Sequence, residues 1–155
     1  MNRIIRLSDL TYSDVAIQYG IHNKPDIIQE ENLMYFIEQL LDPICRLCIY
    51  AVKVKLGFVS KELNKILKFP KWNPHLYGFA ADLYTSDKNK IKFFKTVYNW
   101  LTDSNIPFHE FRIVNNKFDW HLHLSIQDNY SHQRRFVEMI QDGKYQSFDL
   151  SKIHD

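Results

Sequence analysis

Apolar residues recur along this chain with two periods, and each period predicts a different kind of secondary structure. Between residues 26 and 49 they fall three or four positions apart in one stripe, which predicts a long amphipathic helix. Pro43 lies within this stripe, so we expect a kink or break near residues 39–42, because proline lacks an N–H and clashes with the preceding turn. Helical spacing and capping residues predict four further helices, over residues 13–19, 60–67, 87–101 and 131–140.

Other segments alternate apolar and polar residues, which is the period of a half-buried strand. Strands are predicted in this way at residues 52–56, 79–84, 108–113 and 118–126. The last two should form a hairpin around Asn115 and Asn116, a favourable pair of turn residues. Helices that precede and separate the strands of a small sheet indicate an α+β fold, in which a small antiparallel sheet packs against helices.

The bulk composition narrows the class of protein. A chain of 155 residues is long enough for one domain with its own core, and we expect a single domain over residues 1–155. The net charge of +2 is too small to indicate nucleic-acid binding, and no stretch approaches the roughly 20 apolar residues of a membrane helix. Residues 1–10 lack the apolar core of a signal peptide, so we expect synthesis in the cytoplasm.

Two cysteines, Cys45 and Cys48, form a C-x-x-C pair inside the predicted long helix. Such a pair can be redox-active or can provide half of a zinc site. The sequence nearby contains no second pair and no accompanying histidines, and residues three apart share one face of a helix. We therefore interpret both cysteines as buried helix residues in preference to a redox or metal site.

A second group of residues has the chemistry of a zinc site. His75 and Asp82 lie seven positions apart, and His123 follows in a later strand of the predicted sheet. Histidine nitrogens and aspartate oxygens are ligands that zinc accepts. Three protein ligands leave a fourth position open for water, which is the arrangement of a hydrolase and not of a structural zinc site.

Two residues next to this group are candidates for the proton transfers of a hydrolytic reaction. Asp119, His121 and His123 share one face of the second hairpin strand, and apolar residues occupy the other. Asp119 could take a proton from the attacking water, or it could close the hairpin turn. His121 could donate a proton, or it could be a polar residue on the wet face. We prefer Asp119, since His121 risks binding the metal itself, and we rank Glu110 below both.

The candidate ligands also lie in runs that resemble a known motif. The run Asn73-Pro-His-Leu-Tyr-Gly-Phe-Ala-Ala-Asp82 resembles the S-x-H-x-x-G-x-A-x-D motif of the M15 family of zinc metallopeptidases. The run His121-Leu-His123-Leu-Ser125 resembles the W-x-H-x-S segment that contains their last zinc ligand. Further similarity to the family lies near residues 7–21, 32–43 and 57–64, in the family's order along the chain.

This resemblance implies a specific fold, cofactor and substrate. The M15 family contains the D-Ala-D-Ala carboxypeptidases and related phage endolysins, which cut peptidoglycan peptides. Their fold is therefore expected here, with one Zn²⁺ held by His75, Asp82 and His123. Peptidoglycan peptides are the expected substrate, and neither nucleic acid nor a membrane is expected as a partner.

Two positions depart from the family's pattern. Val59 stands where the family has the arginine that holds the substrate carboxylate or the polarised carbonyl, and valine donates no hydrogen bond. Trp120 stands where several subfamilies have an acidic general base. The resemblance thus implies either a peptidase with weak or lost activity, released at lysis, or an inactive member of the family. An inactive member would serve as a structural or assembly component, for example of a bacteriophage virion, with other virion proteins as partners.

Overall fold

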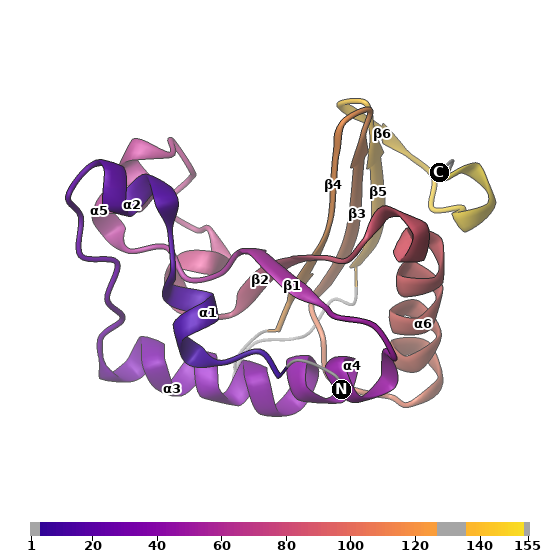
Figure 1. The fold of residues 1–155 in the computed structure, drawn as a ribbon, viewed down its shortest axis with the longest axis horizontal. Helices are drawn as coiled ribbons and strands as arrows, with labels where there is room; N and C mark the ends of the chain where they lie inside the picture. Colours follow the sequence, from indigo (N-terminus) through magenta and orange to yellow (C-terminus); the bar gives the residue numbers. More distant parts are fainter. Residues whose placement is uncertain (1–3, 127–135, 154–155) are drawn as a thin grey trace.

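A six-stranded mixed sheet forms the centre of the molecule (Figure 1). The computed structural model describes residues 4–126 and 136–153. The strands follow the order β1-β2-β4-β3-β5-β6 and comprise β1 (Lys53–Leu56), β2 (Ala80–Tyr84), β3 (Glu110–Asn116), β4 (Asp119–Ser125), β5 (Phe136–Gln141) and β6 (Lys144–Gln146). Neighbouring strands run antiparallel except β3 and β5, which are parallel. The α+β class is confirmed, but the expectation of a purely antiparallel sheet is wrong, because β5 joins it in parallel.

The two faces of the sheet differ in character. One face packs into the main apolar core through fully buried residues on β2, β3, β4 and β5: Ala81, Leu83, Phe111, Ile113, Leu122, Leu124 and Met139. The helices contribute to the same core through Leu33, Phe36, Leu40, Ile44, Phe93, Phe94 and Val97. Successive strand residues point to opposite faces, so Asp82, Arg112 and His123 lie on the other face. These helices thus cover one face of the sheet, and the other face presents polar groups.

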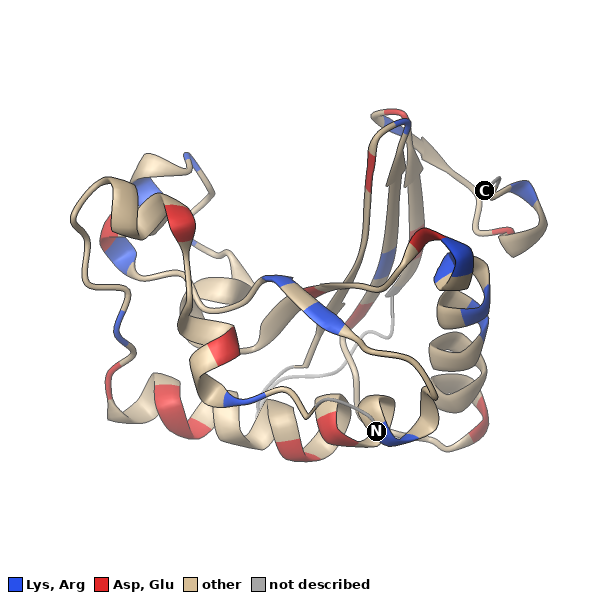
Figure 2. Cartoon of the chain, viewed as in Figure 1, with Lys and Arg blue, Asp and Glu red and all other residues tan. Residues whose placement is uncertain are grey.

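The helices before and between the strands are mostly those that the sequence predicts. They are α1 (Leu7–Thr11), α2 (Asp14–Gln18), α3 (Ile27–Phe36), the π-helical turn η1 (Ile37–Leu41), α4 (Asp42–Leu47), α5 (Lys61–Ile66) and α6 (Lys90–Asp103), with short 3-10 turns η2 (Pro74–Tyr77), η3 (Asp87–Asn89) and η4 (Leu150–Lys152). Ser13 and Ser60 cap α2 and α5 by accepting hydrogen bonds from backbone N–H groups three residues on. Figure 2 shows acidic residues along α3 and basic residues along α6.

The predicted long helix is present as α3, η1 and α4 in direct succession. Its expected break before Pro43 takes the form of the π-helical turn, which a proline favours because it supplies no N–H for the regular ladder. The capping box of Asp26 and Gln29 fixes the start of α3. The break therefore changes the hydrogen-bond pattern without ending the helical path.

Two predictions about the second half of the chain are wrong. The sequence predicts a helix over residues 131–140, but residues 131–135 lie outside the described residues, and 136–141 form strand β5. Hydrogen bonding to β3, a contact distant in sequence, overrides the local helical pattern there. The hairpin turn lies at Lys117 and Phe118 instead of at Asn115 and Asn116, since Asn116 pairs with Asp119. Asn115 is buried in the strand, where its side chain accepts a hydrogen bond from Lys90.

Cys45 and Cys48 are both buried in the core, as the sequence predicts. Burial raises the pKa of each thiol. A raised pKa reduces the fraction of reactive thiolate, which supports a packing role for both residues. Among the described residues, no helix has the length and apolar character needed to cross a membrane.

Candidate metal centre

Cross-strand pairing places one row of chemically active side chains on the polar face of the sheet. Asp82 on β2 is opposite His123 on β4, and His123 is opposite Arg112 on β3. Arg112 is in turn opposite Glu138 on β5. Leu56 at the end of β1 is the neighbour of Asp82 on the other side. Because side chains on directly opposed residues lie close together, the register alone assembles most of the site.

His75 reaches this row from outside the sheet. It lies in η2, where its backbone N–H donates to the side-chain oxygen of Asn73 at 3.2 Å. Gly78 ends the turn with a φ of 81°, and a Cβ there would lie 2.6 Å from the carbonyl oxygen of Gln29. Only glycine fits such a position, and the tight turn leads the chain directly into β2. The short connection thereby holds His75 beside Asp82.

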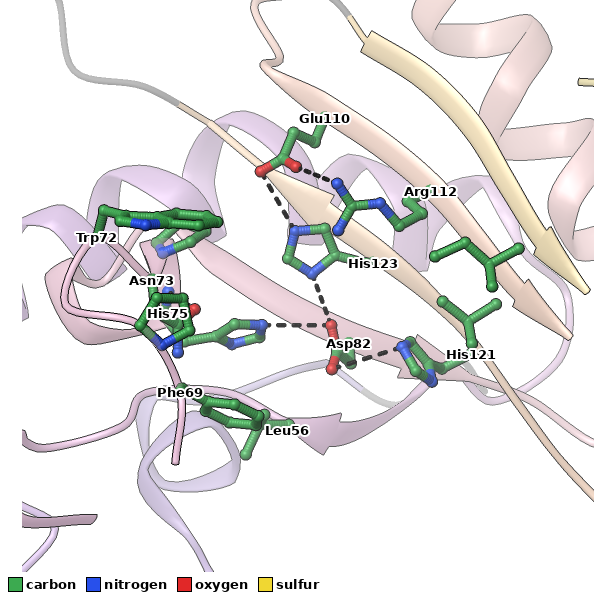
Figure 3. Close-up of a pocket in the computed structure, with 14 residues that line it drawn as sticks. Leu56, Phe69, Trp72, Asn73, His75, Asp82, Glu110, Arg112, His121 and His123 are labelled. Carbon is green, nitrogen blue, oxygen red and sulfur yellow. Dashed lines mark hydrogen bonds and ion pairs between the residues drawn. The ribbon is translucent and has the colours of Figure 1, made fainter. Parts of the chain in front are cut away.

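The three predicted ligands come together in the structure (Figure 3). Nε2 of His75 lies 3.3 Å from Oδ1 of Asp82, and Nδ1 of His123 lies 2.8 Å from the same oxygen. One donor atom from each residue falls within 4.8 Å of the others, and all three residues are buried. In a tetrahedral zinc site with bonds of about 2.0–2.1 Å, the donor atoms are about 3.3–3.4 Å apart. The His-Asp-His group therefore fits a metal ion after only small adjustments.

A backbone contact sets the orientation of the His75 ring. Its Nδ1 lies 2.8 Å from the carbonyl oxygen of Gly57, which places the N–H on Nδ1 and leaves the lone pair of Nε2 facing Asp82. A Cβ on Gly57 would lie 2.2 Å from the carbonyl oxygen of Leu10. The glycine therefore allows the close approach of α1 that positions this carbonyl group.

A carboxylate supports the ring of His123 from its other side. Oε1 of Glu110 lies 3.4 Å from Nε2 of His123 and accepts a hydrogen bond from the Ser125 hydroxyl at 3.0 Å. Arg112 donates to Oε2 of Glu110 and to Glu138, at 2.8 Å in both cases. A carboxylate on the far nitrogen of a metal-binding histidine fixes its tautomer and raises its basicity. Glu110 thus leaves Nδ1 of His123 available as the ligand atom.

The electrostatics of the cluster keep its carboxylates ionised. Burial alone would raise the pKa of Asp82, but the charges and hydrogen bonds of His75 and His123 lower it well below its usual range. The hydrogen bond from His123 lowers the pKa of Glu110 to about 2. Burial alone would lower the pKa of His123, but its hydrogen bonds to Asp82 and Glu110 raise it to about 9. Without metal, ionised Asp82 and Glu110 are thus paired with a protonated His123, and a metal cation bound at Nδ1 of His123 would take the place of that proton.

The two predicted proton carriers occupy different places. His121 lines the same cleft as the cluster, with its Nε2 3.7 Å from Oδ2 of Asp82, and its buried Nδ1 finds no hydrogen-bond partner among the described residues. Asp119 shares the face of His123, but four residues of strand put about 13 Å between them. Its carboxylate forms an ion pair with Lys55 in a neighbouring hollow and is largely exposed. The structure thus brings His121 to the cluster and leaves Asp119 at the hairpin end.

The two positions that depart from the M15 pattern face the interior. Val59 is fully buried and packs with Ala16 and Leu63 in a small separate core. Trp120 lies on the core face of β4, where its ring packs against Phe94 and its Nε1 donates to a carboxylate oxygen of Asp87. Neither side chain lines the cleft beside the candidate ligands.

Sequence reasoning ranked Glu110 low and missed Arg112. Both lie on β3, two residues apart, so they share the polar face with His123. The alternation of Glu110, Arg112 and Val114 with buried Phe111 and Ile113 was the available signal. That signal gives the face of each residue, but the pairing of β3 with β4 determines which polar groups meet.

A cleft of about 260 Å³ opens beside the cluster. Its walls combine the three candidate ligands and Glu110, Arg112 and His121 with apolar groups. Trp72, which is 77 % exposed, lies at its edge. The cluster is therefore accessible from one side, as a site with an open coordination position requires.

Comparison with known proteins gives no further guide to the family. The chain matches no model of a known protein family, and no curated protein is significantly similar to it. The chemistry of the site is therefore the basis for assigning a function.

Proposed function

We propose that this protein is a zinc-dependent hydrolase of peptide bonds, built on an M15 peptidase-like fold. The observation that supports it best is the convergence of one donor atom each from His75, Asp82 and His123 at the wall of a cleft. Two imidazoles and one carboxylate, with a fourth side open, are a typical ligand set of catalytic zinc. The resemblance of the surrounding runs to the M15 motifs suggests peptidoglycan peptides as the substrate.

Different residues of the cleft would have different roles in such a reaction. A zinc ion held there would act as a Lewis acid and lower the pKa of its water. His75 and His123 are oriented by Gly57 and Glu110 so that the correct nitrogen faces the site. His121 lies on the cleft wall with one ring nitrogen unpartnered among the described residues, so we propose it as the proton carrier ahead of Asp119.

Metal analysis tests this proposal directly. Protein purified without chelator should contain one zinc per chain, and His123→Ala should lose it, whereas His22→Ala, at an exposed site, should keep it. Purified peptidoglycan should release new amino groups slowly. The missing arginine should reduce the rate on the order of a hundredfold relative to an active M15 endolysin. Absence of zinc from the wild-type protein would refute the proposal.

A second function is favoured by the burial of Val59. Valine offers no hydrogen-bond donor, and its burial in a separate core keeps its side chain out of the cleft, so Val59 cannot bind a substrate carboxylate as the arginine of the M15 family would. We therefore also propose, as the alternative, a catalytically inactive M15-like protein that serves in an assembly such as a virion. Zinc content with no release of amino groups from peptidoglycan would favour this alternative.

A further inference from the structure

The cleft lining includes apolar side chains that metal binding does not use. Leu56, Phe69, Val114 and Ile140 line it together with the candidate ligands, and we refer to these four as the apolar strip. All four are partly exposed, and Phe69 is 38 % exposed. A sheet face turned away from the core normally carries polar residues, so apolar groups at these positions call for an explanation.

The strand register places three members of the apolar strip beside Asp82, Arg112 and His123, and Phe69 comes from the loop after α5. Val114 on β3 is opposite His121 on β4 and opposite Ile140 on β5, one pleat along from Arg112 and His123. Leu56 is opposite Asp82 at the other end. A substrate bound at the cluster would therefore contact apolar surface on both sides of the Asp82 and His121 side chains.

We propose that the apolar strip is a substrate subsite for an apolar side chain next to the bond that is cut. This inference rests on the proposed hydrolase function. Nearby charge agrees with it, because Asp82, Glu110 and Glu138 are carboxylates, and Arg112 is already engaged by two of them. An acidic side chain in the cleft would meet repulsion, whereas an apolar one gains from leaving water.

The dimensions of the cleft limit the substrate. A volume of about 260 Å³ lies below the roughly 300–1,000 Å³ typical of drug-sized ligands. The subsite therefore suits one residue of a short or extended peptide. Trp72 at the edge of the cleft offers a further aromatic surface to the same segment.

Hydroxamates, which chelate zinc without being hydrolysed, test the subsite independently of turnover. The zinc-loaded protein should be titrated calorimetrically with acetohydroxamate, isocaproic hydroxamate and succinic monohydroxamate. The branched apolar tail should bind about tenfold or more tightly than acetohydroxamate, because each buried methylene adds to affinity. The acidic tail should bind no better than acetohydroxamate.

Two near-isosteric variants identify the surface responsible. Val114→Thr should reduce the preference for the apolar tail several-fold, since it adds a hydroxyl to the apolar strip. Val137→Thr makes the same change on the neighbouring strand β5, but on the face that packs against the core, and should leave the preference intact. Equal binding of all three hydroxamates, or a preference unaffected by Val114→Thr, would overturn the subsite while leaving the hydrolase proposal in place. Failure of every hydroxamate to bind zinc-loaded protein would instead count against the open metal site itself.

Discussion

Replacing Glu110 with glutamine tests whether this carboxylate holds His123 in its metal-binding orientation. The side chain contacts Nε2 of His123, the Ser125 hydroxyl and the guanidinium of Arg112. Glutamine keeps the shape but loses the charge, and its NH₂ group must face at least one of the donors that now meet an oxygen. Loss of such a supporting carboxylate typically costs 10–100-fold in metal affinity, or about 1.4–2.7 kcal/mol.

The assay is competition for zinc between the protein and a chromophoric chelator at fixed pH. Glu110→Gln should raise the dissociation constant for zinc by about 10–100-fold. Ser125→Ala removes one neutral hydrogen bond to the same carboxylate and should have a smaller effect, about 0.5–1.5 kcal/mol. Glu62→Gln, on the exposed side of α5, is the matched control and should bind zinc like the wild type.

An unchanged zinc affinity in Glu110→Gln, with the protein folded by circular dichroism, would refute this reasoning. It would mean that the 3.4 Å contact to His123 does not orient the ring. Asp82 alone would then determine the tautomer of His123.

Two further predictions concern stability. In chelator-treated protein, the raised pKa of His123 should contribute stability that is fully present below about pH 6.5 and is lost as the pH rises through about 9; thermal melts across this range should fall towards alkaline pH, and a flat profile would contradict the ion pair with Asp82. Gly57→Ala should lower the melting temperature, because its Cβ would lie 2.2 Å from the Leu10 carbonyl oxygen and overpacking typically costs about 1–3 kcal/mol; a melt and a zinc affinity matching the wild type would show that α1 moves away freely.

The local sequence pattern is sufficient to predict the three candidate ligands, but it does not predict the residues that surround them. The short path from His75 to Asp82 and the alternation around His123 are properties of neighbouring residues, and both ligand runs could be found in the sequence. Glu110 and Arg112 become part of the site only because β3 pairs with β4 in one register. A register is decided by contacts distant in the sequence, so the residues that support the histidine were not evident.

The difference between local pattern and distant pairing also explains the wrong predictions about Asp119 and the segment that forms β5. Alternation placed Asp119 on the correct face of β4, but it says nothing of distance along the strand, and the hairpin extends far enough to separate Asp119 from the cluster. Val137 and Met139 lie on the core face of β5, yet the segment gave no clear strand signal, because its parallel partner β3 lies elsewhere in the chain. Such pairing depends on the whole fold.

Because β5 pairs with β3 in parallel, the last part of the chain covers what would otherwise be an exposed edge of the sheet at β3. With β5 in place, β3 has hydrogen-bonded neighbours on both sides, and Arg112 binds Glu138 on β5 as well as Glu110 on its own strand. All three candidate ligands precede β5 in the sequence, so during synthesis they emerge while β3 still has one side unpaired. An unpaired strand is a template for association with other chains. Arrival of β5 thus both closes that exposed edge and completes the support of the metal centre.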